Sequence, residues 1–311
     1  MSIEVATTRE ELASSLALLD GRVGLVMTMG ALHEGHISLV HQIKQLVDHV
    51  VVSIFVNPTQ FAPGEDFDAY PRTLESDLEK LAEEGGVDLV FAPATDDVMY
   101  PQPVQFTLDP GPIAKVLEGA TRPTHFQGVA LVVTKVFGLV RPDVAIFGQK
   151  DAQQLAMLRL LVRDLDLPVE IIQGAIVRED DGLAMSSRNR YLSADEREQA
   201  LALSRSVEAG RIAGESGADG AGVIAATRAV LDAEPGVDVD YVALRSVHDF
   251  SDLAGWTPGD APTGAFVLVA AKVGKTRLID NAVVSLGGSA DGTVGGSTNT
   301  AETDTAEEAS R

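Results

Sequence analysis

The sequence predicts an α/β protein, with a Rossmann-like, doubly wound parallel sheet followed by a smaller C-terminal α+β domain. Two observations lead to this fold class. Short runs of branched apolar residues alternate with helix-like segments over about the first 177 residues, and the alternation stops there. Strands that are apolar on both faces are typical of a parallel sheet that helices cover on both sides.

Five short runs are the expected strands of this sheet, because each is rich in β-branched residues and bounded by polar or turn-forming ones. They are Val23 to Val26, Val50 to Val56, Val87 to Phe91, Val144 to Phe147 and Val169 to Ile172. In doubly wound sheets, ligands bind at the carboxyl ends of the strands. The polar residues that follow these runs are therefore the first candidates for a functional site.

Helices are expected between these strands. Thr8 and Glu11 match a capping box that opens the first helix. The second helix is expected to start near His36, and apolar residues recur along it at helical spacing. Its predicted buried face consists of Ile37, Val40, Ile43 and Val47. Two more helices are expected over residues 74–81, ended by Gly85-Gly86, and over residues 152–163.

The second part of the chain has a different pattern. Ser193 and Glu196 match another capping box, which opens a long helix, and an Ala-rich helical segment follows near residues 219–233. VDVDYVALRSV is an expected strand, and FVLVAAKV and TRLID form an expected hairpin that turns at Gly274-Lys275. We therefore divide the chain into a Rossmann-like domain (residues 1–177), a smaller α+β domain (178–286) and a disordered acidic tail (287–311).

Composition and charge narrow the possible partners and chemistry. The chain has 46 acidic and 24 basic residues and a formal charge of −22, so nucleic acid and anionic membranes are not expected partners. It contains no cysteine, which excludes disulfides, thiolate catalysis and Cys-type zinc sites. No apolar run approaches the roughly 18 residues of a membrane helix, and the amino terminus lacks a secretory signal, so we expect a cytoplasmic protein.

The densest polar motif is MGALHEGH, which follows the strand at Val23. His33 and His36 lie where a helix begins, and free backbone N–H groups and the helix dipole attract anions there. Imidazole N–H donors at this position suit the phosphates of ATP. A zinc site and two ordinary loop histidines are the alternatives, although the histidine spacing is one residue shorter than in helical zinc motifs.

Two further strand ends carry polar residues. Gln60 and Phe61 follow Asn57-Pro58, and an amide beside an aromatic ring suits a small, hydroxylated, partly apolar ligand. Lys150 and Asp151 lie at a helix start, where they suit a phosphate and a ribose hydroxyl, respectively. The alternatives are a surface turn around Gln60, and a helix-capping Asp151 beside a solvated Lys150.

The remaining candidate site residues lie on one loop and on two segments with weaker signals. Ser186, Ser187 and Arg188 offer hydroxyl donors and a permanent cation to a polyphosphate, although a solvated loop would have the same composition. Arg122, in RPTHFQGV, is a candidate carboxylate or phosphate contact, with a surface salt bridge as the alternative. Asp77 is a candidate for Mg²⁺ bound to phosphates, or an acid that favours the first turn of its helix.

Six segments together resemble one family. In this order, MGALHEGH, FVNPTQF, YPRT, RPTHFQGV, FGQKDAQQL and MSSRNRYL resemble the pantoate–β-alanine ligases of the HIGH-motif nucleotidyltransferase superfamily, over about residues 20–285. The resemblance implies ATP-dependent condensation of pantoate with β-alanine to pantothenate through a pantoyl adenylate, with release of AMP and pyrophosphate. It also implies Mg²⁺ and a homodimer, and places nucleotide and pantoate in the first domain.

The resemblance also assigns roles to residues. The implied catalytic, phosphate-binding groups are His33, His36, Lys150, Ser186, Ser187 and Arg188. Further implied ATP contacts are Met29, Gly148 and Asp151. The implied pantoate contacts are Gln60, Gln154, Met29 and Phe61, with Arg122 as an additional ligand contact and Asp77 beside Mg²⁺. The chain departs from the family pattern at Met27, Thr124 and Gln149, where Pro, Gly and Glu are usual.

Two other functions fit the same residues. An adenylyltransferase would use a similar nucleotide pocket and leave AMP on its product. A nucleotide-sensing protein would keep the pocket and bind ATP without turnover. Product analysis separates these functions from a ligase, because only the ligase releases free AMP when β-alanine is present.

Overall fold

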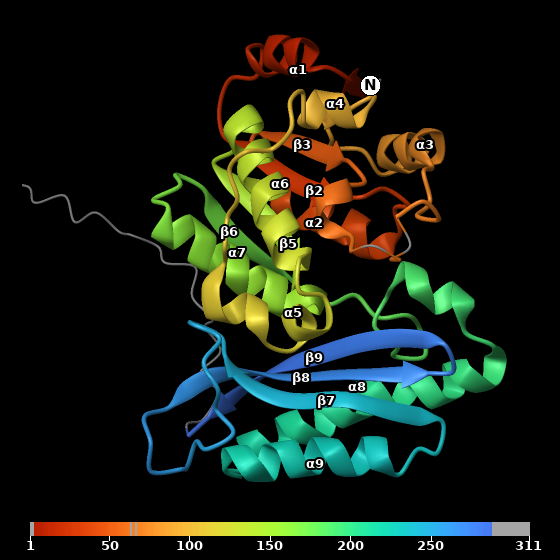
Figure 1. Cartoon of the computed structure of the whole chain (residues 1–311), viewed down its shortest axis with the longest axis vertical. Helices are drawn as coiled ribbons and strands as arrows, with labels where there is room; N and C mark the ends of the chain where they lie inside the picture. The colour runs from red at the N-terminus through yellow and green to blue at the C-terminus, as the bar shows by residue number, and fades with distance from the viewer. Residues whose placement is uncertain (1–2, 63, 66, 288–311) are drawn as a thin grey trace, which may run out of the picture.

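The computed structural model describes residues 3–62, 64–65 and 67–287. In this part of the chain, two sheets lie in two stacked regions (Figure 1). The tail expected over residues 287–311 lies outside the described residues, apart from Gly287. No helix of the described ranges is both long and apolar enough to cross a membrane.

The first sheet has six parallel strands in the order β1-β4-β3-β2-β5-β6. Its strands are β1 (Glu4–Ala6), β2 (Val23–Thr28), β3 (His49–Ile54), β4 (Leu89–Phe91), β5 (Val144–Gly148) and β6 (Glu170–Gly174). From β2 the chain adds strands on one side, and from β5 it continues on the other. The order therefore reverses between β2 and β5, which is where doubly wound sheets bind ligands.

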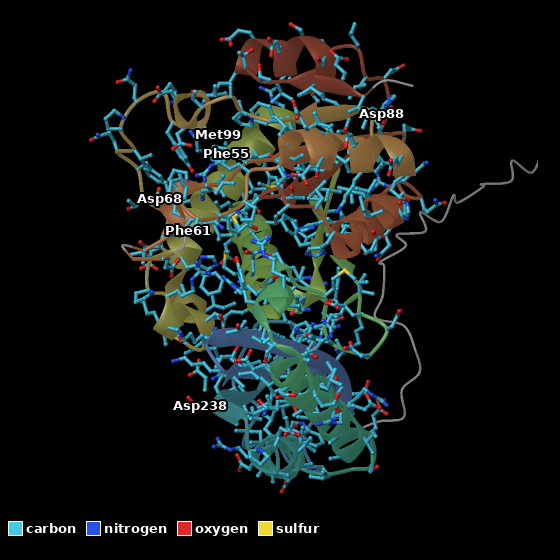
Figure 2. The ribbon with its side chains drawn as sticks, turned by 90° about the vertical axis from the view of Figure 1, so that its right-hand side faces the viewer. Phe55, Phe61, Asp68, Asp88, Met99 and Asp238 are labelled. Atoms are coloured by element: carbon cyan, nitrogen blue, oxygen red, sulfur yellow. The ribbon has the colours of Figure 1, made fainter. Side chains whose placement is uncertain are left out.

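Helices cover both faces of this sheet, as predicted. They are α1 (Arg9–Leu16), α2 (Glu34–Ile43), α3 (Leu74–Glu84), α4 (Asp96–Met99), α5 (Glu118–Thr121), α6 (His125–Val140) and α7 (Ala152–Asp164). Neighbouring strand residues point to opposite faces. Leu25 joins the core under α1, α6 and α7, to which Phe55 and Met99 also belong (Figure 2), whereas Val26 joins the core under α2 and α3. These two apolar layers fix the sheet in place.

Four short 3₁₀ helices follow strands or loops near the carboxyl edge of the sheet and its connection to the second region. They are η1 (Pro58–Gln60), η2 (Gly111–Lys115), η3 (Gln149–Asp151) and η4 (Ser187–Tyr191). The predicted motifs FVNPTQF, FGQKD and MSSRNRYL each contain one of these turns.

The second region packs an antiparallel sheet against two helices. Its elements are α8 (Ala194–Glu215), α9 (Gly220–Asp232), β7 (Val237–Ser246), β8 (Thr263–Val273) and β9 (Thr276–Leu286). Val267 faces α8 and α9, whereas Phe266 and Leu268 join the core of the first region. The fold class and the hairpin at Gly274-Lys275 are confirmed. The boundary at residue 177 stays a prediction, and falls between β6 and α8.

Three expectations about single elements were wrong or incomplete. Helix α2 starts at Glu34 rather than near His36, and it ends at Ile43, so Val47 packs beside the helix instead of on it. The sequence reasoning assigned no element to α6 or to the edge strand β1. Helix α6 is rich in β-branched valines, which do not favour a helix by propensity, and tertiary packing decides its structure.

Helix α6 approaches η1 so closely that the contact requires a glycine. A Cβ atom added at Gly128 would lie 2.2 Å from the carbonyl oxygen of Thr59. Gly128→Ala should therefore lower the free energy of unfolding by about 1–3 kcal/mol, as overpacking typically does. Gly138→Ala is the matched control on the same helix, because nothing lies within 4 Å of its added Cβ, and it should stabilise slightly. Urea unfolding measures both; equal effects of the two changes would contradict this account.

Candidate active site

A cleft of about 310 Å³ opens at the carboxyl ends of β2 and β5, where the strand order reverses. Its walls come from the loop after β2, η1, the start of α6, η3 with α7, and the segment that contains η4. All predicted site residues except Asp77 line this cleft. They are Met29, His33, His36, Gln60, Phe61, Arg122, Gly148, Lys150, Asp151, Gln154, Ser186, Ser187 and Arg188.

The two histidines form the beginning of helix α2. His33 is the N-cap residue, and its Nδ1 accepts a hydrogen bond from the backbone N–H of Gly35 at 3.1 Å. Nδ1 of His36 accepts one from the backbone N–H of His33 at 3.3 Å. Because Nδ1 of each ring is an acceptor, a neutral ring carries its proton on Nε2. Both rings, whose centroids lie 4.1 Å apart, therefore have an Nε2–H donor left for a ligand.

Burial keeps these rings neutral. It is the main cause that lowers the pKa of His36 to about 3, and the neighbouring His33 and Lys150 lower the pKa further. Burial also lowers the pKa of His33, again with Lys150 as a second cause. Near neutral pH the rings act as hydrogen-bond donors without a charge. Cations for an anionic ligand must come from other side chains.

Asp77 stabilises the loop between β2 and α2 and does not line the cleft. It is buried, and its carboxylate accepts hydrogen bonds from the backbone N–H groups of Ala31 (3.0 Å) and Leu32 (2.8 Å) and from the Thr73 hydroxyl (3.1 Å). Asp77 lies in the first turn of α3, as the alternative interpretation has it, and it does not line the cleft; its contact with Mg²⁺ stays a prediction. Among the described residues, no group of three or more His, Asp or Glu side chains is placed to hold a metal ion.

The turn η1 places the amide of Gln60 at the cleft. Asn57 is buried and donates from Nδ2 to Oε1 of Gln60 at 3.1 Å, while Nε2 of Gln60 lies 3.0 Å from the sulfur of Met29. Phe61 follows, with its ring edge-on to those of Phe67 and Tyr70. The sequence reasoning treated Asn57 only as a strand breaker. Nδ2 of Asn57 also donates to the carbonyl oxygen of Gly128 at 3.2 Å, a contact that the local sequence does not indicate.

Arg122 lines the cleft and forms an ion pair with Glu65. Its guanidinium contacts both carboxylate oxygens of Glu65, at 2.8 and 2.6 Å. The sequence reasoning named His125 only beside Arg122. Nδ1 of His125 lies 3.0 Å from the carbonyl oxygen of Gln60. A carbonyl accepts, so Nδ1 carries the proton and Nε2 faces Nη1 of Arg122 at 3.3 Å. The salt-bridge alternative for Arg122 therefore fits, and His125 holds the backbone of η1.

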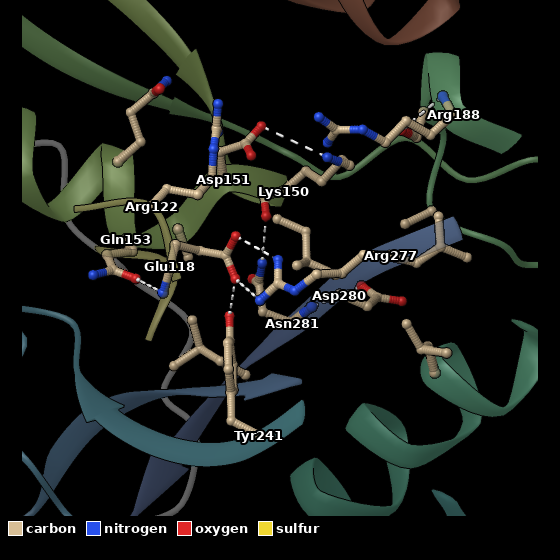
Figure 3. A pocket seen from close by; sticks show the side chains of 18 of the residues that line it. Glu118, Arg122, Lys150, Asp151, Gln153, Arg188, Tyr241, Arg277, Asp280 and Asn281 are labelled. Atoms are coloured by element: carbon tan, nitrogen blue, oxygen red, sulfur yellow. Dashed lines mark hydrogen bonds and ion pairs between the residues drawn. The ribbon is translucent and has the colours of Figure 1, made fainter. Parts of the chain in front are cut away.

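Lys150 and Asp151 project from η3 at the start of α7 (Figure 3). Their charged groups lie 3.7 Å apart. Asp151 occupies the N-cap position, but its side chain makes no capping hydrogen bond, so the capping alternative fails. Its carboxylate is 53% exposed and accessible to a ligand hydroxyl.

The segment with Ser186, Ser187 and Arg188 lies against the start of α2. The sulfur of Met185 accepts from the backbone N–H of Gly35 at 3.2 Å. The Ser186 hydroxyl oxygen accepts from the backbone N–H of Arg188 at 3.3 Å and so caps η4. The loop is therefore ordered by the fold, and it brings the Arg188 guanidinium to the same cleft as Lys150.

Comparison with known proteins identifies the family. The family model described as pantoate-beta-alanine ligase matches residues 3–283. The chain belongs to the pantoate–β-alanine ligase family. The resemblance inferred from the six motifs is thus confirmed, and the chain is a ligase that joins pantoate to β-alanine.

Relatives of this ligase are similar over most of their length. A pantothenate synthetase of a Nocardioides species is 55% identical, over 91% of this chain and 86% of its own length, and that of Thermobifida fusca is 53% identical, over 91% and 96%. The crystal structure of the Thermus thermophilus pantothenate synthetase is 43% identical and has a TM-score of 0.81, covering 90% of this chain and 99% of its own. The ligase of Francisella tularensis, crystallised with β-γ ATP and β-alanine, is 32% identical with a TM-score of 0.70, covering 90% and 97%.

The neutral state of His36 predicts a pH dependence of stability. Its pKa is about 3 in the fold, against 6.5 for an ordinary histidine, so between these values only the unfolded chain binds the proton. The free energy of unfolding should therefore fall as the pH is lowered from 6.5. His36→Gln keeps an acceptor for the capping bond but cannot titrate, and should weaken this pH dependence by at most about 1.4 kcal/mol per pH unit.

Urea unfolding between pH 4 and 7 measures this difference. His248→Gln is the control, because that ring is exposed and outside the cleft, and it should leave the pH dependence unchanged. A His36→Gln protein with the full pH dependence of the wild type would contradict this account, because it would show that folding does not lower the pKa of His36.

Proposed function

We propose that this ligase activates pantoate in the cleft as pantoyl adenylate and then transfers the pantoyl group to β-alanine. In the first step a carboxylate oxygen of pantoate forms a bond to the α-phosphorus of ATP, and pyrophosphate leaves. In the second step the amine of β-alanine forms a bond to the acyl carbon, AMP leaves and the amine loses a proton. The observation that carries this proposal is the single cleft shared by the imidazole, ammonium and guanidinium groups.

The first step needs position and electrostatics more than proton transfer. A carboxylate with a pKa near 4 is ionised at pH 7, so it attacks without a general base or a protein nucleophile. The site must instead bring this anion to a polyanion and stabilise the charge that develops on phosphorus. Fixed donors and cations in a partly buried cleft do this better than water, because they need no reorganisation.

The proposed roles follow from the chemistry of the cleft. Phosphates accept from Nε2–H of His33 and His36, whose tautomers the start of α2 fixes. Lys150 and Arg188 add positive charge to the same cleft, and Ser186 and Ser187 add hydroxyl donors. We expect the ribose at the exposed carboxylate of Asp151 and adenosine beside the backbone of Gly148.

Pantoate is proposed to bind on the η1 side of the cleft. Gln60 and Gln154 supply amide groups for its hydroxyls and carboxylate, while Met29 and Phe61 supply apolar surface for its methyl groups. Asn57 fixes the amide of Gln60 by a hydrogen bond, which lowers the entropy lost on binding. Arg122 is partly neutralised by Glu65 and is proposed as an additional contact with the ligand.

The second step requires a neutral amine. An amine with a lysine-like pKa of about 10.4 is mostly protonated at pH 7, and forming its neutral form costs roughly 4–5 kcal/mol. His33 and His36 present N–H donors, and Nε2 of His125 faces Arg122, so we assign no histidine as the proton acceptor. Water or an oxygen of the leaving phosphate takes this proton in our proposal.

The remaining partners are proposed from the family. The Francisella tularensis ligase complex with β-γ ATP and β-alanine supports ATP and β-alanine as ligands of this chain. Mg²⁺ is proposed to accompany ATP, held mainly by the phosphate oxygens of the nucleotide, whose negative charge it would partly neutralise. We further propose that the protein is a homodimer and is located in the cytoplasm. The molar mass from light scattering tests the dimer.

The proposal is tested by the exchange of labelled pyrophosphate into ATP. The wild type should catalyse exchange only when pantoate is present, and should release AMP only when β-alanine is added. Lys150→Ala should slow the exchange by about a hundredfold or more, since it removes a positive charge that stabilises the developing negative charge on phosphate, with little loss of stability. Lys272→Ala, an exposed lysine outside the cleft, is the matched control and should exchange at the wild-type rate.

Two results would contradict the proposal. Absence of exchange by folded wild-type protein would refute the first step. Exchange without release of free AMP on addition of β-alanine would indicate an adenylyltransferase instead of a ligase. A normal rate for Lys150→Ala would remove that residue from the mechanism.

A further inference from the structure

Strand β9 of the C-terminal sheet contacts the backbone that carries Lys150. Asn281 is 2% exposed, and its side-chain NH₂ group donates to the carbonyl oxygen of Lys150 (Figure 3) and to that of Gln149, both at 3.0 Å. Its Oδ1 accepts from Nε2 of Gln149 at 3.0 Å. One buried amide thus holds two consecutive peptide groups of η3, although 131 residues separate it from Lys150.

These two carbonyl groups belong to the single 3₁₀ turn that joins β5 to α7. The chain leaves β5 at Gly148, passes through the single turn η3 and enters α7 at Ala152. Buried carbonyl groups need hydrogen-bond partners, and the direction of each carbonyl sets the rotation of its peptide plane. The amide of Asn281 therefore restricts the backbone dihedral angles of Lys150 itself.

The neighbouring residue of β9, Asp280, contacts the segment that leads to Arg188. Asp280 is also 2% exposed and accepts from both guanidinium nitrogens of Arg178, at 2.7 and 3.1 Å. Arg178 lies on the segment that leads to Ser186 and Arg188, and it also donates to the carbonyl oxygen of Gly182 at 3.1 Å. The backbone N–H of Asn281 donates to Asp280 at 2.7 Å, which couples the two contacts.

A third contact of the same strand reaches the segment before Arg122. Arg277 binds both carboxylate oxygens of Glu118 at 2.8 and 2.7 Å, and the Tyr241 hydroxyl donates to Glu118 at 2.9 Å (Figure 3). Glu118 is the first residue of α5, and its carbonyl oxygen accepts from the backbone N–H of Arg122 at 2.9 Å. Strand β9 thus contacts three of the segments that form the cleft.

We propose that Asn281 is a positioning residue for the adenylation step, which sets where the Lys150 ammonium and the Asp151 carboxylate enter the cleft. Asn281 does not line the cleft but lines a smaller pocket that shares Lys150 and Asp151 with it (Figure 3), and it acts through the two carbonyl groups. This inference rests on the proposed contact of Lys150 with the phosphates of ATP. It makes the C-terminal sheet a part of the nucleotide site's geometry and not only its cover.

Asn281→Asp is the sharpest test, because it preserves the shape of the side chain. It places a carboxylate oxygen against two carbonyl oxygens, so the clamp on η3 is lost. A misplaced Lys150 should reduce kcat/KM for ATP in pyrophosphate exchange by about tenfold to a hundredfold, with little change in KM for pantoate. Asn281→Ser, which shortens the side chain without adding a charge, should change the same constants in the same direction.

Two controls separate positioning from a loss of stability. Gln149→Ala removes the side-chain bond to Asn281 but keeps both carbonyl bonds, and should exchange nearly as the wild type does. Thr227→Val removes a buried hydroxyl bond to the Val223 carbonyl in the same region, far from the cleft. It should lower the urea midpoint and leave kcat and both KM values unchanged.

The inference is overturned if both Asn281 variants exchange with wild-type constants for ATP, or if Thr227→Val loses as much exchange as they do. Calorimetric titration with ATP provides a readout that does not need turnover. If the wild type binds ATP but does not exchange, the proposed function fails, and the inference then depends on binding alone. In that case an unchanged ATP affinity of Asn281→Asp overturns it, and a weakened affinity supports it.

Discussion

Two anionic reactants, a carboxylate and a triphosphate, repel each other, and a protein with a formal charge of −22 adds to that repulsion. The fold must therefore create a small region in which positive charge and N–H donors dominate. It does so where β2 and β5 separate, because the segments that follow both strands turn toward the same cleft. Lys150 and Arg188 supply the charge, and the start of α2 supplies uncharged donors. The excess of acidic residues elsewhere makes this local arrangement necessary.

Backbone hydrogen bonds prepare the donors of the cleft before any ligand arrives. The N–H groups at the start of α2 occupy Nδ1 of His33 and His36, so Nε2 carries the proton, and burial keeps the rings neutral. Asp77 holds the loop between β2 and α2 from behind. Strand β9 supports the segments that carry Lys150 and Arg188 in the same way, through Asn281 and Asp280. These supporting side chains are buried, whereas the carboxylate of Asp151, which lines the cleft, is exposed.

Much of this arrangement could be predicted from the sequence because it depends on local patterns. Branched apolar runs predicted the parallel sheet, and polar residues just after those runs predicted the cleft. Helix α6 was missed because its valines resemble a strand as much as a helix. The hydrogen bonds of Asp77 to the loop after β2 could not be predicted, because its partners at positions 31 and 32 are remote in sequence. Asn281 had no local signal at all, since its partners lie 132 and 131 residues away.

The central claim is that one electropositive cleft holds both anionic reactants, and a crystal structure with a non-hydrolysable ATP analogue and pantoate tests it most directly. We expect the triphosphate between Nε2 of the two histidines and the Lys150 and Arg188 side chains, with the pantoate carboxylate facing the α-phosphorus from the Gln60 side. A nucleotide bound elsewhere, or a pantoate carboxylate directed away from the α-phosphorus with the side chains of the cleft free of phosphate, would contradict the account.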